Sequence, residues 1–374
     1  MCLLCVVVEC AWGPGHGCAQ SKMAADGCIL SRVDDGSVMY NRYFHPSYFH
    51  VCELLFGRYG GHTSLFPSGM CAIDSLLTVL GIQNGWNPMN LVLQDEMYCD
   101  TYRTARYLND FFYMPLNIHK MDVTKDISLA DLDLSIPTVL FVESCSNPNG
   151  HLFNFDQLAE LKRKVPSLTV CVDNTWLTSA LLNPFQWPEV DYVVCSLTKY
   201  YGAGRSGIAG AVMARSKQNS NALREYGKVK GLHVSPVYCR SLARTIPTMD
   251  ARLKKTGDMT AELARWLKSK LYTVHHPSFT GQRTYLKPGM HPSVLTVEVP
   301  LSKKAALKWM RSSNRFDCST SYGGPDSRFD QWPSRRNGMT VCRFSVGYED
   351  NIDDLIKEYT EQLAKMAVGV QSYV

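Results

Sequence analysis

The stretch Val193-Val194-Cys195-Ser196-Leu197-Thr198-Lys199-Tyr200 is an apolar run that ends in hydroxyl side chains and a lysine. A second apolar run, Val170-Cys171-Val172, lies upstream and ends in Asp173-Asn174-Thr175. Short, nearly continuous apolar runs are typical of strands that are buried in a parallel sheet, where the carboxyl ends share one edge. The sequence therefore predicts an acid, Asp173, and an amine, Lys199, at two strand ends of an α/β fold.

An acid and an amine in this arrangement fit the chemistry of pyridoxal 5'-phosphate (PLP). The cofactor needs an amine to hold its aldehyde as a Schiff base and a carboxylate to keep its pyridine nitrogen protonated. We interpret Lys199 as the amine and Asp173 as the carboxylate, with the hydroxyls of Ser196 and Thr198 as phosphate contacts. Taken alone, Lys199 fits an ordinary surface lysine better, so the interpretation depends on the other motifs.

Length, charge and cysteine content limit the classes of protein that fit. The 374 residues exceed one ordinary core, so we expect a large domain and a smaller one, or one very large α/β domain. The net charge of +5 comes from scattered Lys and Arg and gives no reason to expect nucleic acid or membrane as a partner. Most of the 14 cysteines lie in apolar runs, so we expect reduced thiols and a cytoplasmic location. Cys2 and Cys5 have no second pair at zinc spacing, and no metal site is expected.

Alternating strands and helices divide the chain into three predicted parts. Residues 1–45 form an N-terminal arm, whose apolar start contains Glu9 and lacks a basic segment, so that it makes a poor signal peptide. Residues 46–235 form a large PLP-binding domain, and residues 236–374 form a smaller C-terminal α/β domain. The expected elements are strands at 91–93, 138–142, 168–172 and 192–195, half-buried strands at 294–299 and 341–346, helices at 156–164, 259–271 and 303–311, and a last helix at 352–366 that Asn351 caps.

A second candidate phosphate contact is the segment Phe66-Pro67-Ser68-Gly69-Met70-Cys71-Ala72. Ser68 is a typical N-cap, and the apolar spacing that follows predicts a helix that stops at Gly81. A glycine in the first turn lets a phosphate approach the free N–H groups, where the helix dipole favours negative charge. A capped core helix without a ligand fits this segment equally well.

Three further strand ends carry side chains that suit an amino acid and a pyridine ring. Tyr98 follows the strand at 91–93 and offers an aromatic face and a phenol for proton transfer. Asn147 follows the strand at 138–142 and can bond the cofactor's ring oxygen. Arg343 alternates with apolar residues in a C-terminal strand, and a buried arginine needs an anion such as a substrate carboxylate. A structural salt bridge is the alternative explanation for Arg343.

These segments occur in the order that is typical of the Cys/Met-metabolism family of PLP enzymes, which the chain resembles from about Val38 to Met366. That family includes cystathionine γ-synthases, cystathionine lyases and methionine γ-lyases. The matching pieces are Tyr40-Asn41-Arg42 before Pro46, Ser68-Gly69-Met70, Tyr98 with Thr101 and Arg103, Glu143 to Pro148, Val172 to Thr175, Ser196 to Tyr200, Ser321 to Gly324, and Arg343 to Gly347 followed by Glu349-Asp350.

The resemblance implies a type I aminotransferase-like PLP fold in which dimers share their active sites and pair into tetramers. It implies that Tyr40 and Arg42 reach the neighbouring subunit's phosphate, and that Lys199 is both the Schiff-base lysine and the proton shuttle. The remaining implied cofactor contacts are Ser68, Gly69, Met70, Tyr98, Asn147, Asp173, Thr175, Ser196 and Thr198. The implied substrate contacts are Ser321 and Arg343 for the carboxylate, with Arg103, Asp100 and Thr320 toward the distal end.

Several positions depart from the family pattern. Cys99-Asp100 stands where the family commonly has two glycines after the stacking tyrosine, and Ala203-Gly204-Arg205-Ser206 replaces a Gly-His-Ser-Asp segment. Thr320 stands where cystathionine-handling enzymes often have a glutamate that binds the substrate's far amino group. These departures weaken the specific substrate assignment more than the fold, and they favour a side chain other than the distal end of cystathionine.

The expected activity is a PLP-dependent γ-elimination or γ-replacement on a γ-substituted L-amino acid, such as an O-acylhomoserine, cystathionine or a relative of these. Lys199 would remove the α-proton, and Tyr98 would act as acid and base for the leaving group. Two alternatives remain open at this point. One is β-elimination, of the cystathionine β-lyase or cysteine desulfhydrase type. The other is a non-catalytic homologue that acts as an interaction protein.

Overall fold

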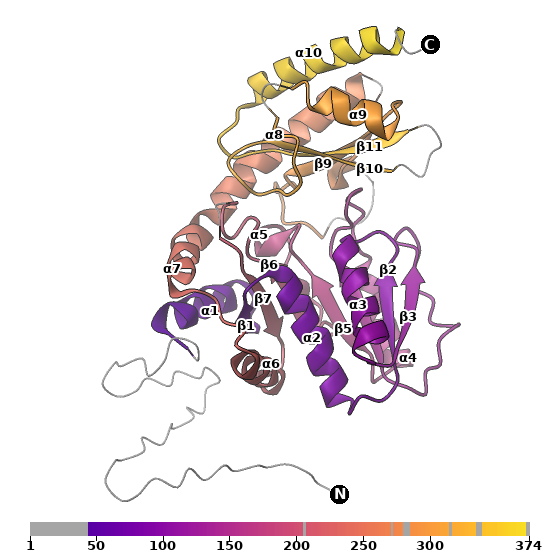
Figure 1. The fold of residues 1–374 in the computed structure, drawn as a ribbon, viewed down its shortest axis with the longest axis vertical. Helices are drawn as coiled ribbons and strands as arrows, with labels where there is room; N and C mark the ends of the chain where they lie inside the picture. The colour runs from indigo at the N-terminus through magenta and orange to yellow at the C-terminus, as the bar shows by residue number, and fades with distance from the viewer. Residues whose placement is uncertain are drawn as a thin grey trace, which may run out of the picture.

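The computed structural model describes residues 44–204, 207–270, 272–279, 285–313, 316–333 and 339–371. Figure 1 shows a larger lower part and a smaller upper part, each built around its own sheet. The lower sheet has seven strands and the upper sheet has four. This arrangement confirms the predicted fold class, an α/β fold with a mainly parallel large sheet and a smaller C-terminal α/β domain.

The strands of the large sheet are β1 (His62–Phe66), β2 (Met89–Gln94), β3 (Leu116–Met121), β4 (Thr138–Glu143), β5 (Thr169–Asp173), β6 (Tyr192–Ser196) and β7 (Gly210–Ala214). Their order across the sheet is β1-β7-β6-β5-β4-β2-β3, and β7 runs antiparallel to both of its neighbours. Every residue of β2 and β4 is buried, which explains their continuous apolar runs. The four strands predicted from those runs are confirmed to within two residues at each end.

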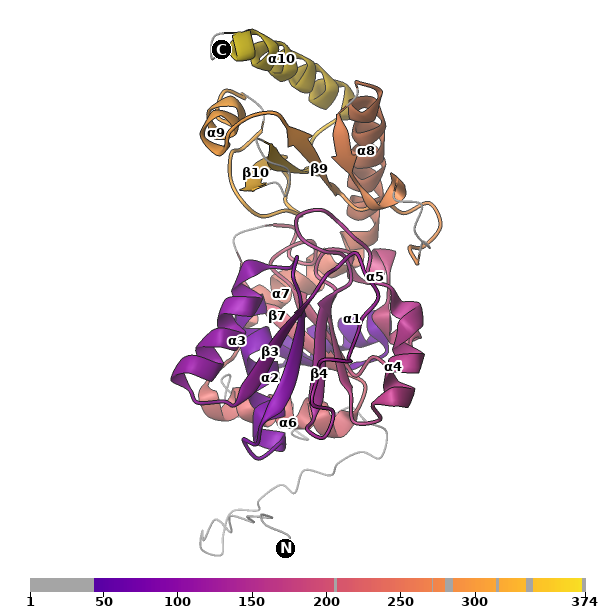
Figure 2. The ribbon, with the colours of Figure 1, turned by 90° about the vertical axis from the view of Figure 1, so that its right-hand side faces the viewer.

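Helices cover both faces of this sheet: α1 (Pro46–Tyr59), α2 (Gly69–Gln83), α3 (Cys99–Phe111), α4 (Leu158–Lys164), α5 (Thr178–Leu181), α6 (Lys217–Lys230) and α7 (Pro236–Thr245). One core joins α2, α3 and α6 to the face that carries Leu91 and Leu93. A second core joins α1, α4, α5 and α7 to the face that carries Val92. Figure 2 shows α3 and α4 on opposite sides of the sheet. Alternate residues of one strand thus face two cores.

The predicted end of α2 was wrong by two residues. Ser68 caps the start as expected, since its Oγ accepts a 3.0 Å hydrogen bond from the N–H of Cys71. The helix continues through Gly81 to Gln83. A Cβ at Gly81 would lie 2.1 Å from the methyl carbon of Met114, so the glycine there makes room for a packed side chain and does not terminate the helix.

The small domain consists of α8 (Met249–Ser269), β8 (Thr273–His275), β9 (Val294–Val299), α9 (Lys303–Met310), β10 (Arg328–Pro333), β11 (Thr340–Ser345) and α10 (Ile352–Gln371). Its antiparallel sheet has the order β10-β11-β9-β8. The helices predicted here are present, and Asn351 caps α10 by accepting a 2.9 Å hydrogen bond from the N–H of Asp354. No described helix is both long enough and apolar enough to cross a membrane.

The expectation that β9 and β11 are half-buried was wrong, because all residues of both strands are buried. Both strands are central in the sheet, and α8, α9 and α10 cover one face (Figure 1). On the large-domain side, Ser293 donates a 2.7 Å hydrogen bond to the phenol of Tyr200, and Thr296 donates one of 3.3 Å to Asn149. The large domain therefore covers the other face of the small-domain sheet.

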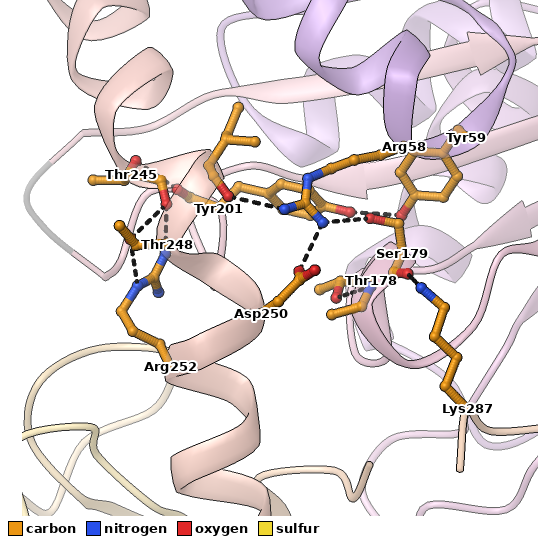
Figure 3. Close-up of polar contacts among 12 residues, drawn as sticks. Arg58, Tyr59, Thr178, Ser179, Tyr201, Thr245, Thr248, Asp250, Arg252 and Lys287 are labelled. Carbon is orange, nitrogen blue, oxygen red and sulfur yellow. Dashed lines mark hydrogen bonds and ion pairs between the residues drawn. The ribbon is translucent and has the colours of Figure 1, made fainter. Parts of the chain in front are cut away.

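A polar cluster joins the two parts at the start of α8 (Figure 3). Arg58 of α1 donates to Asp250 at 2.7 Å, to the carbonyl of Ile246 at 3.1 Å and to Ser179 at 3.4 Å. Lys287 of the small domain donates a 2.9 Å bond to the carbonyl of Ser179. Along α8 the buried side chains change from the large-domain core to the small-domain core. The domain boundary expected at residue 235 stays a prediction.

Candidate active site

A cavity of about 220 Å³ lies where the carboxyl ends of β4, β5 and β6 meet the small domain. This position is the usual ligand site of an open α/β sheet. The large domain supplies hydroxyls, carboxylates and Lys199, and the small domain supplies Arg343 and the segment from Thr320 to Tyr322. The lining residues are Ser68, Gly69, Met70, Ile73, Tyr98, Glu143, Cys145, Asn147, Asp173, Thr175, Trp176, Ser196, Thr198, Lys199, Thr320, Ser321, Tyr322 and Arg343.

Lys199 lies just beyond β6, and its Nζ donates a 2.8 Å hydrogen bond to Oγ of Ser321. Burial, and then the positive charges of Arg343 and Arg328, lower the pKa of Lys199 to about 8. Ser321 has a φ of 97°, a left-handed conformation that is rare outside glycine. The strained backbone brings the Ser321 hydroxyl to the amine, whose lowered pKa makes its neutral, nucleophilic form more accessible than in an ordinary lysine.

Asp173 ends β5 and is half-buried in the cavity wall. Its Oδ1 accepts a 2.8 Å hydrogen bond from the N–H of Thr175, and Oγ1 of Thr175 accepts one of 2.8 Å from the N–H of Ser196. Burial raises the pKa of Asp173, while the bonds from Thr175 and the charge of Lys199 act in the opposite direction. A protonated ring nitrogen is the partner that would favour the charged carboxylate here.

The start of α2 forms a cradle with the residues that follow β6. The backbone of Gly69 lies so close to Ser196 that a Cβ would be 2.8 Å from the Cβ of Ser196. A Cβ at Gly210 would lie 2.3 Å from the carbonyl oxygen of Ser68. The hydroxyl of Thr198 is 3.3 Å from both the N–H and the carbonyl of Ala209. These glycines leave the first N–H groups of a 15-residue helix open to an anion.

Tyr98 lines the cavity immediately before α3. Its main-chain N–H donates a 2.7 Å hydrogen bond to Oε1 of Glu143. Burial, and then the charge of Asp100, raise the pKa of the phenol. Asp100 and Arg103 form a 2.9 Å ion pair in the first turn of α3, and neither residue lines the cavity.

Arg343 is buried at the center of β11 and reaches the large domain. Its NH1 donates a 2.9 Å hydrogen bond to Oδ1 of Asn147, and its NH2 lies 3.6 Å from Oδ2 of Asp330. The guanidinium also lies over the ring of Trp332, with 4.3 Å between its carbon and the ring centroid. The structural salt bridge considered as the alternative is therefore present. Arg343 also lines the cavity, where its guanidinium is available to an anion.

The cavity thus brings together most of the residues that the sequence predicted. These are Lys199, Asp173, Thr175, Ser196, Thr198, Ser68, Gly69, Met70, Tyr98, Asn147, Ser321, Thr320 and Arg343. Tyr40 and Arg42 lie outside the described residues. Among the described residues, no group of three or more His, Cys, Asp or Glu is placed to hold a metal ion.

Glu143 is a lining residue to which the sequence analysis gave no role. Burial, and then the charge of Asp173, raise its pKa well above the ordinary value. Two carboxyl groups so close in a buried site favour a proton on one of them. The sequence could have identified Glu143 in the same way as Asp173, because Glu143 is the acidic residue at the end of an apolar strand. Trp176 and Tyr322, which also line the cavity, had no signal beyond their positions beside Thr175 and Ser321.

These residues fit PLP. The glycine cradle can take the phosphate, Asp173 the ring nitrogen, Lys199 the aldehyde and Tyr98 one face of the ring. Bound there, the cofactor supplies an electron-accepting ring that stabilises negative charge on the amino acid. Fold and cavity together define a PLP enzyme with the type I aminotransferase-like fold.

The chain belongs to the Cys/Met metabolism PLP-dependent enzyme family, whose profile matches residues 19–364. The L-alanine/L-glutamate racemase of Wolbachia pipientis is 24% identical and spans 92% of this chain and 88% of that protein. The cystathionine beta-lyase of Haemophilus influenzae is 24% identical over 89% and 87% of the two chains. The cystathionine gamma-synthase/O-acetylhomoserine (thiol)-lyase of Bacillus subtilis is 23% identical over 84% and 82%.

Solved structures show the same fold. The cystathionine gamma synthase of Xanthomonas oryzae, in complex with aminoacrylate and cysteine, has a TM-score of 0.77 at 22% identity and covers 93% of this chain and 92% of its own. CalE6, a methionine gamma lyase from Micromonospora echinospora, has a TM-score of 0.73 at 21% identity and covers 87% of each chain. The relatives carry out different reactions, so family membership establishes a PLP-dependent enzyme and leaves the substrate open.

Proposed function

We propose that the protein catalyses γ-elimination or γ-replacement on a γ-substituted L-amino acid. The observation that carries the proposal is the presence, in one cavity, of the Lys199 amine, the Tyr98 phenol and the Arg343 guanidinium. γ-Chemistry needs a base that moves protons along the substrate, an acid at the leaving group and an anchor for the carboxylate. The synthases and γ-lyases among the relatives support this assignment.

The roles follow from the contacts of each side chain. Arg343, which Asn147 orients at 2.9 Å, binds the substrate carboxylate as a charge-assisted pair. Lys199, with a pKa of about 8, takes a proton from the substrate's α-carbon and can return it to another carbon of the substrate. The Ser321 hydroxyl orients the Nζ of Lys199. Tyr98, whose raised pKa keeps the phenol protonated at neutral pH, donates a proton to the departing heteroatom.

The second candidate is β-elimination, because several relatives are named cystathionine beta-lyase. The same Lys199, Tyr98 and Arg343 would serve it, since the leaving group differs only by one carbon in position. Thr320, in the place where cystathionine-handling members often have a glutamate, supports a substrate other than cystathionine for either reaction. A non-catalytic role is the least supported alternative, because the cavity retains Lys199, Asp173 and Arg343 together.

We also propose a homodimer with shared active sites that pairs into a tetramer and works in the cytoplasm. Among the described lining residues, Lys199 and Arg343 are the cations, and neither belongs to the cradle at the start of α2. Arg42 of a second copy would supply the charge that a phosphate needs there. The nine described cysteines are free thiols, which supports a reducing compartment.

The test is product analysis with the purified, PLP-loaded enzyme. L-Vinylglycine enters γ-chemistry without a particular leaving group, and O-acetyl-L-homoserine supplies one. We expect 2-oxobutanoate from both, or a replacement product when a thiol is added. Release of pyruvate from cysteine or cystathionine without turnover of the γ-substrates would establish β-elimination instead. Interconversion of D- and L-amino acids alone would assign the chain to the activity of its racemase relative.

A further inference from the structure

We infer that Glu96 is a positioning residue for the substrate carboxylate. It holds the segment 146–149 from within the large domain, and that segment presents Asn147 to the guanidinium of Arg343. The inference rests on the proposed function, in which Arg343 is the carboxylate anchor. It deepens that function because Glu96 is not among the described lining residues, so its effect on a substrate passes through Asn147 and Arg343.

Glu96 and the 146–149 segment follow two neighbouring strands of the large sheet. Glu96 lies just beyond β2, which ends at Gln94, and the segment lies just beyond β4, which ends at Glu143. The two strands pair in parallel, so their carboxyl ends share the edge of the sheet where the cavity lies. Glu96 is buried, and a carboxylate in such a place needs hydrogen-bond donors to replace water.

The carboxylate of Glu96 receives hydrogen bonds from both ends of the 146–149 segment. Its Oε1 accepts a 2.6 Å bond from the hydroxyl of Ser146 and a 3.0 Å bond from the main-chain N–H of Asn149. Its Oε2 accepts a 2.8 Å bond from Nδ2 of Asn149. Hydrogen bonds to a charged acceptor are the stronger ones. One buried carboxylate therefore holds the first and the last residue of the segment.

The backbone that follows closes the segment on its other side. Oγ of Ser146 accepts a 3.0 Å bond from the N–H of His151, and the N–H of Ser146 donates one of 2.9 Å to the carbonyl of His151. The N–H of Gly150 donates a 2.9 Å bond to the carbonyl of Ser146, with a φ of 73° that suits glycine. Asn147 is thus supported on both sides before a substrate binds.

The 146–149 segment contacts the small domain at the carboxylate anchor. Oδ1 of Asn147 accepts a 2.9 Å bond from NH1 of Arg343, and Oδ1 of Asn149 accepts one of 3.3 Å from the hydroxyl of Thr296. Arg343 of β11 and Thr296 of β9 are direct partners in the register of the small sheet. Glu96 therefore fixes a segment whose asparagines bind a cross-strand pair, and that pair includes the guanidinium.

A carboxylate that only supports a loop is the simpler explanation, and the same sheet provides one for comparison. Oδ2 of Asp191 accepts a 2.8 Å bond from the N–H of Val170 and one of 2.8 Å from Nζ of Lys162. Val170 lies near the start of β5, whereas Asp173 at the other end of this strand lines the cavity. If Glu96 only supports its loop, Glu96→Gln and Asp191→Asn should both lower stability and both leave ligand affinity unchanged.

The first experiment measures what the carboxylate of a ligand contributes to binding. L-Norvaline and n-butylamine share the amine and the alkyl chain, only norvaline has a carboxylate, and neither has a leaving group. The spectral change of the PLP-loaded enzyme gives a dissociation constant for each. We expect Glu96→Gln to weaken norvaline binding by about three- to tenfold, the effect of one hydrogen bond, and to leave butylamine binding unchanged. Asp191→Asn should alter neither. Norvaline binding that is equal in Glu96→Gln and in the unaltered enzyme would overturn the inference.

The second experiment separates positioning from a loss of stability. In Glu96→Gln an amide N–H group faces Nδ2 of Asn149, so that two donors meet. Adding Asn149→Asp exchanges donor and acceptor, restores the pairing and keeps the net charge. We expect this double variant to recover most of the norvaline affinity. A double variant that is as stable to urea as the unaltered enzyme, yet binds norvaline no better than Glu96→Gln, would contradict the positioning role.

The third experiment asks whether Glu96 acts through Asn147. In an Asn147→Ala background the contact with Arg343 is already lost, so Glu96→Gln should have little further effect on norvaline binding. Residues that act through one contact give non-additive changes of this kind. If the effects of Glu96→Gln and Asn147→Ala multiply in full, Glu96 acts by another route and the inference is wrong.

Arg343→Lys separates a failure of the inference from a failure of the proposed function. If Arg343→Lys binds norvaline as tightly as the unaltered enzyme, Arg343 is not the anchor, and the proposed role of Arg343 fails together with the inference. If Arg343→Lys weakens norvaline binding and Glu96→Gln does not, only the role of Glu96 fails. Because norvaline has no leaving group, both results are independent of whether the reaction takes place at the β- or the γ-carbon.

Discussion

Arg343 of β11 and Asn147, which follows β4, meet across the boundary between the two domains at 2.9 Å. Arg343 is buried, and its NH2 also lies 3.6 Å from the carboxylate of Asp330 on the neighbouring strand. The direction of the guanidinium therefore depends on both domains at once. A substrate carboxylate that binds here would contact the Arg343 guanidinium, whose orientation depends on both domains.

Replacing Arg343 with Lys should raise KM for the amino acid substrate by about tenfold to a hundredfold, because the ammonium of lysine cannot offer two parallel N–H donors to a carboxylate. Steady-state kinetics separates this effect from chemistry, since kcat should change less than KM. Arg311→Lys, at the end of α9, is the matched control. An unchanged KM in Arg343→Lys would mean that the carboxylate binds elsewhere.

Lys199→Ala should abolish covalent attachment of PLP to the chain. Borohydride reduction of the loaded enzyme followed by peptide mapping should place the label on the peptide that contains Lys199, and the label should disappear in the variant. Lys164→Ala removes an exposed lysine that pairs with Glu160 and serves as the control. A label that persists in Lys199→Ala would assign the amine to another residue.

The rate at which the cofactor-free protein attaches PLP should rise with pH and level off above about 8, since the neutral amine is the nucleophile and the pKa of Lys199 is lowered to about 8. An ordinary lysine would level off only above about 10. Stopped-flow absorbance across this range gives the midpoint. Arg328→Ala removes one of the charges that lower this pKa and should move the midpoint to higher pH. A midpoint that stays in place would exclude that contribution.

Glu143→Gln should make the protein's stability less dependent on pH. Burial, and then the charge of Asp173, raise the pKa of Glu143 in the folded state, so the folded protein keeps a proton that the unfolded chain loses above its ordinary pKa. Stability from this group is complete below the unfolded pKa and is lost as pH rises through the folded one. Urea unfolding from pH 5 to pH 8 should show a shallower decline in the variant. Glu225→Gln, on the exposed surface of α6, should leave the slope as it is.

Arg58→Ala should destabilise the junction of the domains by about 1–2 kcal/mol, because several hydrogen bonds to one side chain are lost together. In the cluster of Figure 3, the contribution of the Arg58–Asp250 ion pair can be measured apart from that of the bond to the Ile246 carbonyl. Asp250→Asn removes the charge opposite Arg58 and keeps the 3.1 Å bond to the carbonyl of Ile246. Chemical denaturation should therefore show a smaller loss for Asp250→Asn. Equal losses would place all of the effect in the ion pair.

The strand ends were predictable because a parallel sheet has a simple pattern. Its strands are buried on both faces and read as apolar runs, and Asp173 and Lys199 follow two of these runs directly. The cap at Ser68 was predictable for a similar local reason. The end of α2 was not predictable, because the glycine at position 81 makes room for the side chain of Met114, which lies on another segment.

The amino-acid sequence by itself determined the strands, the helix caps, the acid and the amine at two strand ends and the family resemblance, because each of these depends on neighbouring residues or on a short motif. The tertiary structure alone decided that Ser321 hydrogen-bonds Lys199, that Arg343 meets Asn147, that Glu143 holds the backbone of Tyr98, and that β9 and β11 are buried on both faces. These contacts join residues that are far apart in the chain. Their distances and the pKa shifts that follow from burial exist only in the folded chain.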